Sequence, residues 1–101
     1  MATTPKVLFR GAATTNTGTV LYTVPTATTS VVTSIVITNT ANALGTFTLA
    51  LAGTSLATTV TVGALDSTVL DLKQVLVAGQ TIAGGASATT INFHISGVEI
   101  S

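Results

Sequence analysis

Hydrophobic and polar residues alternate along most of the chain, which is the pattern of half-buried β-strands. In TFTLAL (residues 46–51), large apolar residues alternate with Thr and Ala, and TVTV (59–62) repeats the pattern. Thr, Val and Ile are frequent throughout, and these β-branched residues favour strands over helices. Residues typical of turns separate the alternating runs. We predict strands over residues 6–10, 18–24, 29–39, 45–52, 57–62, 67–73, 80–83 and 90–100.

Seven to eight short strands separated by turns predict an all-β protein, an antiparallel β-sandwich that is either Ig-like or a jelly-roll. The chain has 101 residues, enough for one core, and we place the single sandwich domain at residues 6–101. Residues 1–5 (MATTP) show no alternation and contain a proline. We predict a flexible N-terminal arm there. It is either a frayed end or a segment that becomes ordered on a partner.

The predicted strand 29–39 is apolar on both faces. Strict alternation places Val31, Ile35 and Ile37 on one face. It places Val32 and Val36 on the opposite face, which would be polar if it met water. That face is either the partly covered outer side of a central strand or a subunit interface.

Val32 and Val36 are therefore candidate interface residues. Thr3, Thr4 and Pro5 are added to them, because an arm that becomes ordered on a partner would bring these residues into the contact.

The last predicted strand, INFHISGVEI (91–100), changes phase in its middle. The apolar residues before Gly97 are out of phase with Val98 and Ile100, which follow it. A β-bulge at Gly97 would insert one residue and restore the phase. We therefore expect one apolar face to continue to the C-terminus.

The composition points to assembly rather than to nucleic acid or lipid. Charged residues make up 6% of the chain and the net charge is zero, whereas an average globular domain has about 25% charged residues. There is no basic patch for nucleic acid or an acidic membrane, so we expect neither partner. Near-zero net charge favours association, and we expect an obligate assembly.

The ionisable residues do not suggest an active site. His94 has no nucleophile motif such as G-x-S-x-G, and we expect it to be exposed or hydrogen-bonded. Asp66 lies in a predicted turn and Asp71 on the polar face of a strand, which argues against a pair of catalytic carboxylates. The chain has no Cys, which excludes thiolate chemistry and Cys-based metal sites. We predict that the protein is not an enzyme and has no cofactor or metal.

Targeting signals are also missing. The N-terminal segment MATTPKVLFRG lacks the apolar core of a signal peptide. No apolar run reaches the length of a transmembrane helix. We therefore expect a protein made in the cytoplasm and not exported by the usual route.

Four segments resemble a group of small virion proteins of tailed bacteriophages: LYTVP (21–25), VVTSIVITNT (31–40), TFTLAL (46–51) and NFHISGVEI (92–100). In that group a LYTVP strand leads to a V-x-S-I-x-I-x-N-T strand, and the chain closes on a GVEI strand. The resemblance covers roughly residues 20–100, and its motifs mark strands and turns, so no functional residue carries over. It implies a capsid decoration (cement) protein, typically a homotrimer, that binds the major capsid protein on the outer surface of the phage head.

Two other functions remain open from the sequence. The first is another structural module of the virion, in the tail, collar or fibre. Such a module would form rings or attach to a long neighbouring protein. The second is an adhesin-type Ig-like binding module on a cell surface, which would need an export signal or a larger parent chain.

Overall fold

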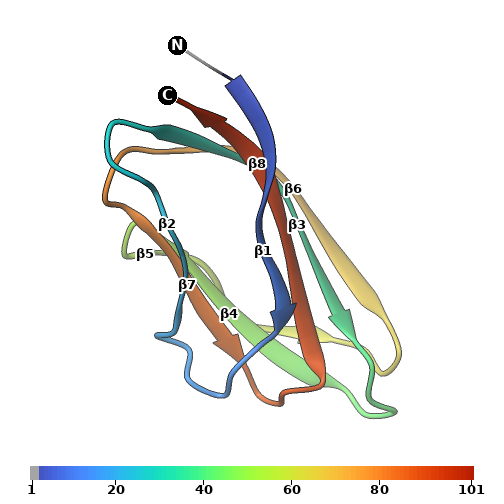
Figure 1. Cartoon of the computed structure of the whole chain (residues 1–101). Helices are drawn as coiled ribbons and strands as arrows, with labels where there is room; N and C mark the ends of the chain where they lie inside the picture. The colour runs from blue at the N-terminus through green and yellow to red at the C-terminus, as the bar shows by residue number, and fades with distance from the viewer. Residues whose placement is uncertain (1–2) are drawn as a thin grey trace.

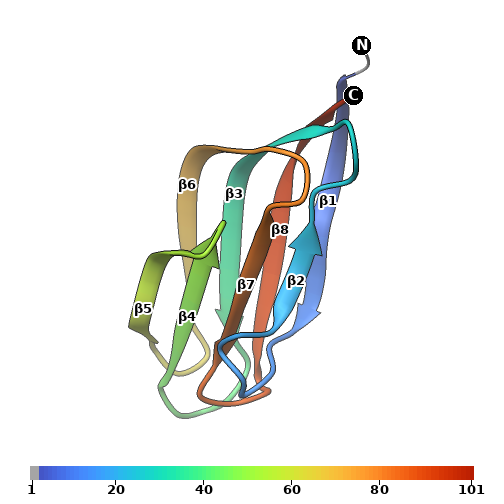
Figure 2. The same cartoon turned by 90° about the vertical axis from the view of Figure 1, so that its left-hand side faces the viewer.

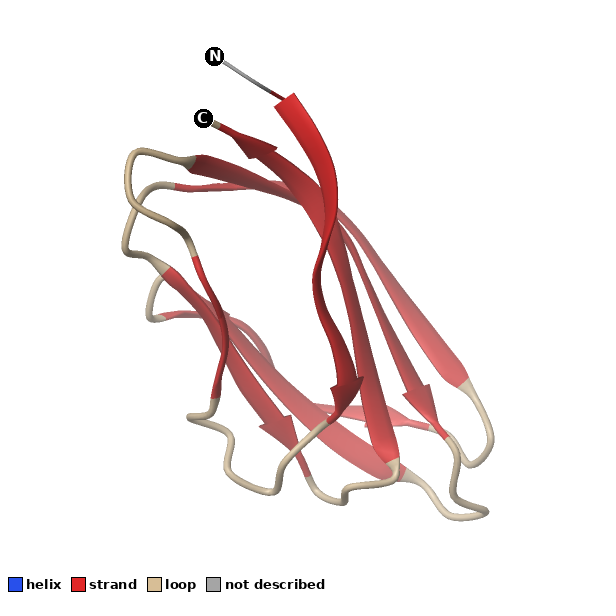
Figure 3. Cartoon of the chain, viewed as in Figure 1, coloured by secondary structure: helices blue, strands red, loops and turns tan. Residues whose placement is uncertain are grey.

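The computed structural model describes residues 3–101, and every regular element in that range is a β-strand (Figures 1 and 3). Eight strands follow one another along the chain, as the alternation predicts. Their bounds are β1 Thr3–Ala12, β2 Val20–Thr23, β3 Thr29–Asn39, β4 Gly45–Leu51, β5 Thr54–Val62, β6 Ser67–Leu76, β7 Thr81–Ala86 and β8 Ile91–Ile100.

The strands form two four-stranded sheets that pack face to face (Figures 1 and 2). One sheet has the order β1-β8-β3-β6 and the other β2-β7-β4-β5, and every ladder is antiparallel. The predicted antiparallel β-sandwich is confirmed. Only β4 and β5 are successive strands in the same sheet, and all other connections cross between the sheets. This order is that of a jelly-roll, and it decides between the two sandwich types left open by the sequence.

The core lies between the sheets and is built from the inward residues of both. The Phe47 ring from β4 meets the Phe93 ring from β8 edge to face, with centroids 6.3 Å apart and planes at 75°. This pair joins the two sheets, and such contacts add to the stabilisation from apolar burial. Other fully buried side chains surround it: Ile35, Ile37, Leu49, Leu76, Ile82, Ile91, Ile95, Val24, Val32 and Val62.

The N-terminal segment differs from the prediction. β1 begins at Thr3, and residues 3–5 pair with Ile100, Glu99 and Val98 of β8. The expected arm over residues 1–5 is therefore wrong for residues 3–5. The rest of that expectation concerns residues 1 and 2, which lie outside the described residues. β8 supplies a complete row of backbone partners, and this explains why a segment without alternation forms a strand.

The apolar residues of β8 before and after Gly97 are out of phase for a different reason from the expected bulge in β8. β1 carries one residue more than β8 at Leu8, and β3 carries one more at Thr33. β8 itself alternates regularly through Gly97. The predicted bulge in β8 is thus wrong, because the extra residues lie in both of its neighbours. In consequence Val98 and Ile100 lie on the outer side of the sheet, and the expected continuous inner face ends at Gly97.

The glycine is required there by packing. A Cβ atom on Gly97 would lie 2.3 Å from the carbonyl oxygen of Val31 and 2.9 Å from Cδ1 of Leu8. Gly84 in β7 is similar, since a Cβ atom there would lie 2.4 Å from the carbonyl oxygen of Thr48. The Gly84-Gly85 pair lies within β7, so this strand runs beyond residue 83, where the predicted strand ends.

We predict that Gly97→Ala lowers the free energy of unfolding by about 1–3 kcal/mol, because the backbone of β3 must move to admit a methyl group. Gly11→Ala is the matched control. Its Cβ atom would lie 3.5 Å from the Phe9 ring, an ordinary contact, and we expect a change within about 0.5 kcal/mol. Urea denaturation of both variants measures the difference, and equal losses would show that the close approach at Gly97 is unimportant.

Candidate functional site

The outer face of the β1-β8-β3-β6 sheet carries an apolar row that crosses all four strands. Backbone pairing aligns Pro5 with Val98, Val98 with Val31, and Val31 with Val75. Val75 is 61% exposed. The row exists because the extra residue at Thr33 turns Val31 outward, where strict alternation would have turned it inward.

The same shift corrects one candidate interface residue. Val32, expected on the outer face, is fully buried in the core at 0% exposure, so this expectation is wrong. Val36 lies beyond the extra residue and does face outward, half-buried, beside Val69, which is 63% exposed. The polar pair Thr33-Ser34, which separates the two apolar runs of this strand, is the sequence signal that could have indicated the extra residue and hence the buried position of Val32.

The other candidate interface residues belong to β1. Thr3 and Pro5 share the outward phase of their partners Ile100 and Val98. Thr4 pairs with Glu99 and shares its inward phase. All three are exposed. The structure thus brings Val36, Thr3 and Pro5 onto one face and leaves Thr4 on the other side of the sheet.

The outer face of the second sheet has a different chemistry. On β4 the outward positions alternate with the buried Phe47 and Leu49, and they are Thr46, Thr48 and Ala50. The neighbouring strands add mostly Thr, Ser, Ala and Gly at their outward positions. One face of the sandwich is therefore lined by valine and the other by small and hydroxyl-bearing side chains.

Charged side chains flank the apolar face at opposite edges. Arg10 on β1 pairs with His94 on β8, and His94 pairs with Val36 on β3. Asp71 and Lys73 both lie on the outer face of β6, the edge strand at the other side of the sheet, because Leu72 between them packs against the core. One edge of the face therefore carries a guanidinium, and the other carries a carboxylate beside an ammonium.

A polar cluster ties the two sheets together at the end where both termini lie (Figure 1). The Tyr22 hydroxyl of β2 donates to Oε2 of Glu99 on β8, at 2.5 Å. Ser30 Oγ lies 2.7 Å from the same hydroxyl oxygen and donates to it, since the phenol proton points to Glu99. Lys6 Nζ donates to Oε1 of Glu99 at 3.2 Å. Sequence reasoning missed this cluster, because it assumed a bulge in β8 that would have turned Glu99 outward.

The cluster shifts two pKa values in opposite directions. The hydrogen bond from Tyr22 lowers the pKa of the Glu99 carboxyl; Lys6 acts in the same direction, and partial burial opposes both. Burial raises the pKa of the Tyr22 phenol, and the nearby carboxylate raises it further. At neutral pH the cluster is a carboxylate held by a neutral phenol and an ammonium, an arrangement that joins strands.

The remaining ionisable residues show no catalytic arrangement. Within residues 3–101 no three His, Asp or Glu side chains gather in a way that could hold a metal ion. Asp66 accepts a hydrogen bond from the backbone N–H of Ser67 at 2.8 Å, the turn role expected for it. His94 lies half-buried on the outer face with Asn92 and Ser96, as the alternation predicts.

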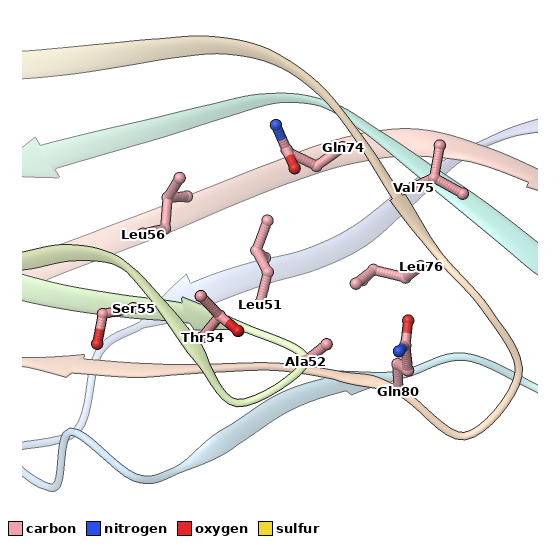
Figure 4. A pocket seen from close by; sticks show the side chains of 9 residues that line it. All are labelled: Leu51, Ala52, Thr54, Ser55, Leu56, Gln74, Val75, Leu76 and Gln80. Carbon is pink, nitrogen blue, oxygen red and sulfur yellow. The ribbon is translucent and has the colours of Figure 1, made fainter.

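Two shallow grooves run along the side of the sandwich where β5 and β6 lie next to each other. The first, of about 370 Å³, is lined by Leu51, Leu56, Leu76 and neighbouring residues (Figure 4). The second, of about 510 Å³, is lined mainly by apolar residues of both strands, and Asp71 is the charged residue among them. Both grooves are open. The first also contains the uncharged polar side chains Thr54, Ser55, Gln74 and Gln80, whereas the second is mainly apolar, and neither combines charged and polar groups in the way that a catalytic pocket does.

No protein-family model matches the sequence, and comparison with curated proteins gives no significant match. In the part of the chain that the structure describes, no helix could span a membrane.

We predict that Glu99→Gln lowers the free energy of unfolding at pH 7 by about 1.5–3 kcal/mol, the usual contribution of a hydrogen bond to a charged group. Because folding lowers the pKa of Glu99, this stabilisation is complete above the ordinary carboxyl pKa and is lost as the pH falls through the folded value. The difference between the two proteins should therefore close below about pH 4.

Urea denaturation from pH 3 to pH 8 tests this prediction. In a Tyr22→Phe background, Glu99→Gln should cost less, since the main partner of the carboxylate is gone. A difference that does not depend on pH would contradict the role given to the carboxylate.

Proposed function

We propose that the protein is a capsid decoration (cement) protein of a tailed bacteriophage, bound to the major capsid protein on the outer surface of the head. What carries the proposal is the valine-lined outer face of a nearly uncharged domain, a surface suited to being covered by protein. The choice of the phage head rests on the resemblance of the LYTVP, VVTSIVITNT, TFTLAL and NFHISGVEI segments to small virion proteins.

The physical properties of the sandwich suit this role. Antiparallel strands in two packed sheets make a stiff body. A decoration protein needs one surface for itself and another for the capsid. The described residues offer two apolar regions, the valine-lined outer face and the groove of about 510 Å³ along β5 and β6. An oligomer that touches several capsomers gains by multivalency, because each further contact forms within the complex. Weak individual contacts can then hold neighbouring capsomers together.

The test is binding of the purified protein to empty expanded heads, measured by co-sedimentation. We expect saturation at a number of copies that matches the capsid lattice. Unexpanded heads and isolated tails are the controls, and both should bind far less. Absence of binding to expanded heads would overturn the proposal, and binding to tails would place the protein in another part of the virion.

Head binding should depend weakly on salt, because few charged groups are present to form ion pairs that salt can screen. We expect the dissociation constant to change by less than about threefold between 50 mM and 500 mM NaCl. The same co-sedimentation assay at both salt concentrations measures it. A loss of binding at 500 mM NaCl would show that the contact is mainly electrostatic.

A further inference from the structure

We propose that the free edge of β6 pairs antiparallel with β6 of a second copy, about a two-fold axis that passes beside Leu72 and runs perpendicular to the sheet. The β1-β8-β3-β6 sheets of the two copies then join into one continuous sheet. This self-association does not rest on the decoration role. It is also distinct from the homotrimer that the resemblance implies.

Of the four sheet edges in the described residues, β6 is the best suited to strand addition (Figure 2). It has ten residues and contains neither Gly nor Pro. The other edge of its sheet, β1, contains Pro5, which has no N–H to donate. In the second sheet, β2 has only four residues. β5 shows two shifts in register, and Thr59 within it has a left-handed backbone with φ of 50°, so its row of backbone donors and acceptors is interrupted.

The outward side chains of β6 complement themselves when the strand is reversed. Around its middle they follow one another as Val69, Asp71, Lys73 and Val75, and all four are exposed. Leu72 lies at their centre and packs against the core. Antiparallel pairing centred on Leu72 sets Asp71 opposite Lys73 of the second copy. It also sets Val69 opposite Val75, and the symmetry repeats both pairs. Opposite charges and apolar side chains that face each other across two strands stabilise the pairing.

The charges select this register. A shift by two residues in one direction sets Asp71 opposite itself, and in the other direction it sets Lys73 opposite itself, so either shift opposes like charges. A shift by one residue would oppose inward and outward side chains. Within residues 3–101 neither side chain forms an ion pair. The charged residues of β1, Lys6 and Arg10, are both positive, so self-pairing of that edge could not match opposite charges.

The irregular part of β6 falls at the proposed axis. Its ladder with β3 shifts between Asp71 and Gln74 and is regular on either side. With the axis beside Leu72, residues 68–70 of one copy pair with residues 74–76 of the other. A regular half of the strand therefore meets a regular half on both sides of the axis.

The same pairing covers the apolar groove beside β6. This groove, of about 510 Å³, is lined by Leu56 and Val60 of β5 and by Leu70 and Leu72 of β6, among other residues. Leu56 and Val60 are 39% and 37% exposed. A second β6 that lies against the first covers the open side of the groove and brings its own Leu72 there, in the inward phase. Apolar burial then supplies affinity, and the charges fix the register.

Native mass spectrometry and analytical ultracentrifugation of the purified chain, without phage heads, test the proposal. We expect a dimer. Asp71→Lys and Lys73→Asp should each raise the dimer dissociation constant at least about tenfold, because each sets like charges opposite each other. A mixture of these two variants should form a dimer again, since every opposed pair then joins a lysine with an aspartate.

Thr46→Lys and Thr46→Asp, on the outer face of the other sheet, are the matched controls. Each should keep the wild-type dissociation constant, and their mixture should associate no more strongly than either variant alone. Circular dichroism should show all four variants folded.

Cross-linking tests the register independently, because the chain has no Cys. Val69→Cys and Val75→Cys change exposed positions. When the two variants are mixed and oxidised they should form a disulfide-linked dimer, since directly opposed residues of an antiparallel pair lie within disulfide reach. Either variant alone should stay uncrosslinked, because its two thiols lie six residues apart along the strands, about 20 Å.

Four outcomes would overturn the proposal. The first is a wild-type monomer at high protein concentration. The second is a trimer, which would favour the assembly implied by the resemblance. The third is failure of the two charge variants to associate when mixed. The fourth is cross-linking of either cysteine variant alone, which would show a different register. Because the dimer is measured without heads, its failure leaves the decoration role to its own test.

Discussion

The close approach of Gly97 to the carbonyl of Val31 controls which residues of the first sheet face inward. β8 runs straight through this point, while both of its neighbours carry an extra residue beside it. The extra residue at Thr33 reverses the phase of β3, so Val32 enters the core and Val31 leaves it. Since β8 keeps its own phase, Glu99 points inward and Val98 outward. A single irregular level in the sheet thus creates both the polar cluster and the apolar row.

The polar cluster places hydrogen-bonding groups between the two sheets, and the valine face places apolar side chains on the outside of the first sheet. At the end of the sandwich that carries both termini, Tyr22, Glu99 and Lys6 join β2, β8 and β1 through hydrogen bonds rather than apolar packing. The apolar residues displaced from the inside at that end appear on the outside of the same sheet. A monomer would expose them to water at a cost in free energy, and a partner would recover that cost by covering them.

Low charge limits what this protein can do and suits what it is proposed to do. Six charged side chains and one histidine are spread over edges, turns and one cluster, and no three of the described acidic and histidine residues converge. Such a domain depends on shape and apolar contact for recognition. The charged side chains on the valine face, Arg10, Asp71 and Lys73, would then help to orient a partner rather than supply most of the affinity.

Period-two alternation and turn residues were enough to predict an all-β sandwich, the existence of eight strands and the outward positions of Val36 and His94. These features depend on local sequence, because one face of each strand must meet the core. The jelly-roll order, the pairing of residues 3–5 and the interior place of Val32 required the tertiary structure. Each depends on which strands lie beside one another, and the register between neighbours was decided at Gly97 by contacts between residues more than sixty positions apart. Alternation along one strand carries no information about an extra residue in the next, so the sequence alone could indicate that an apolar outer face exists but not which valines form it.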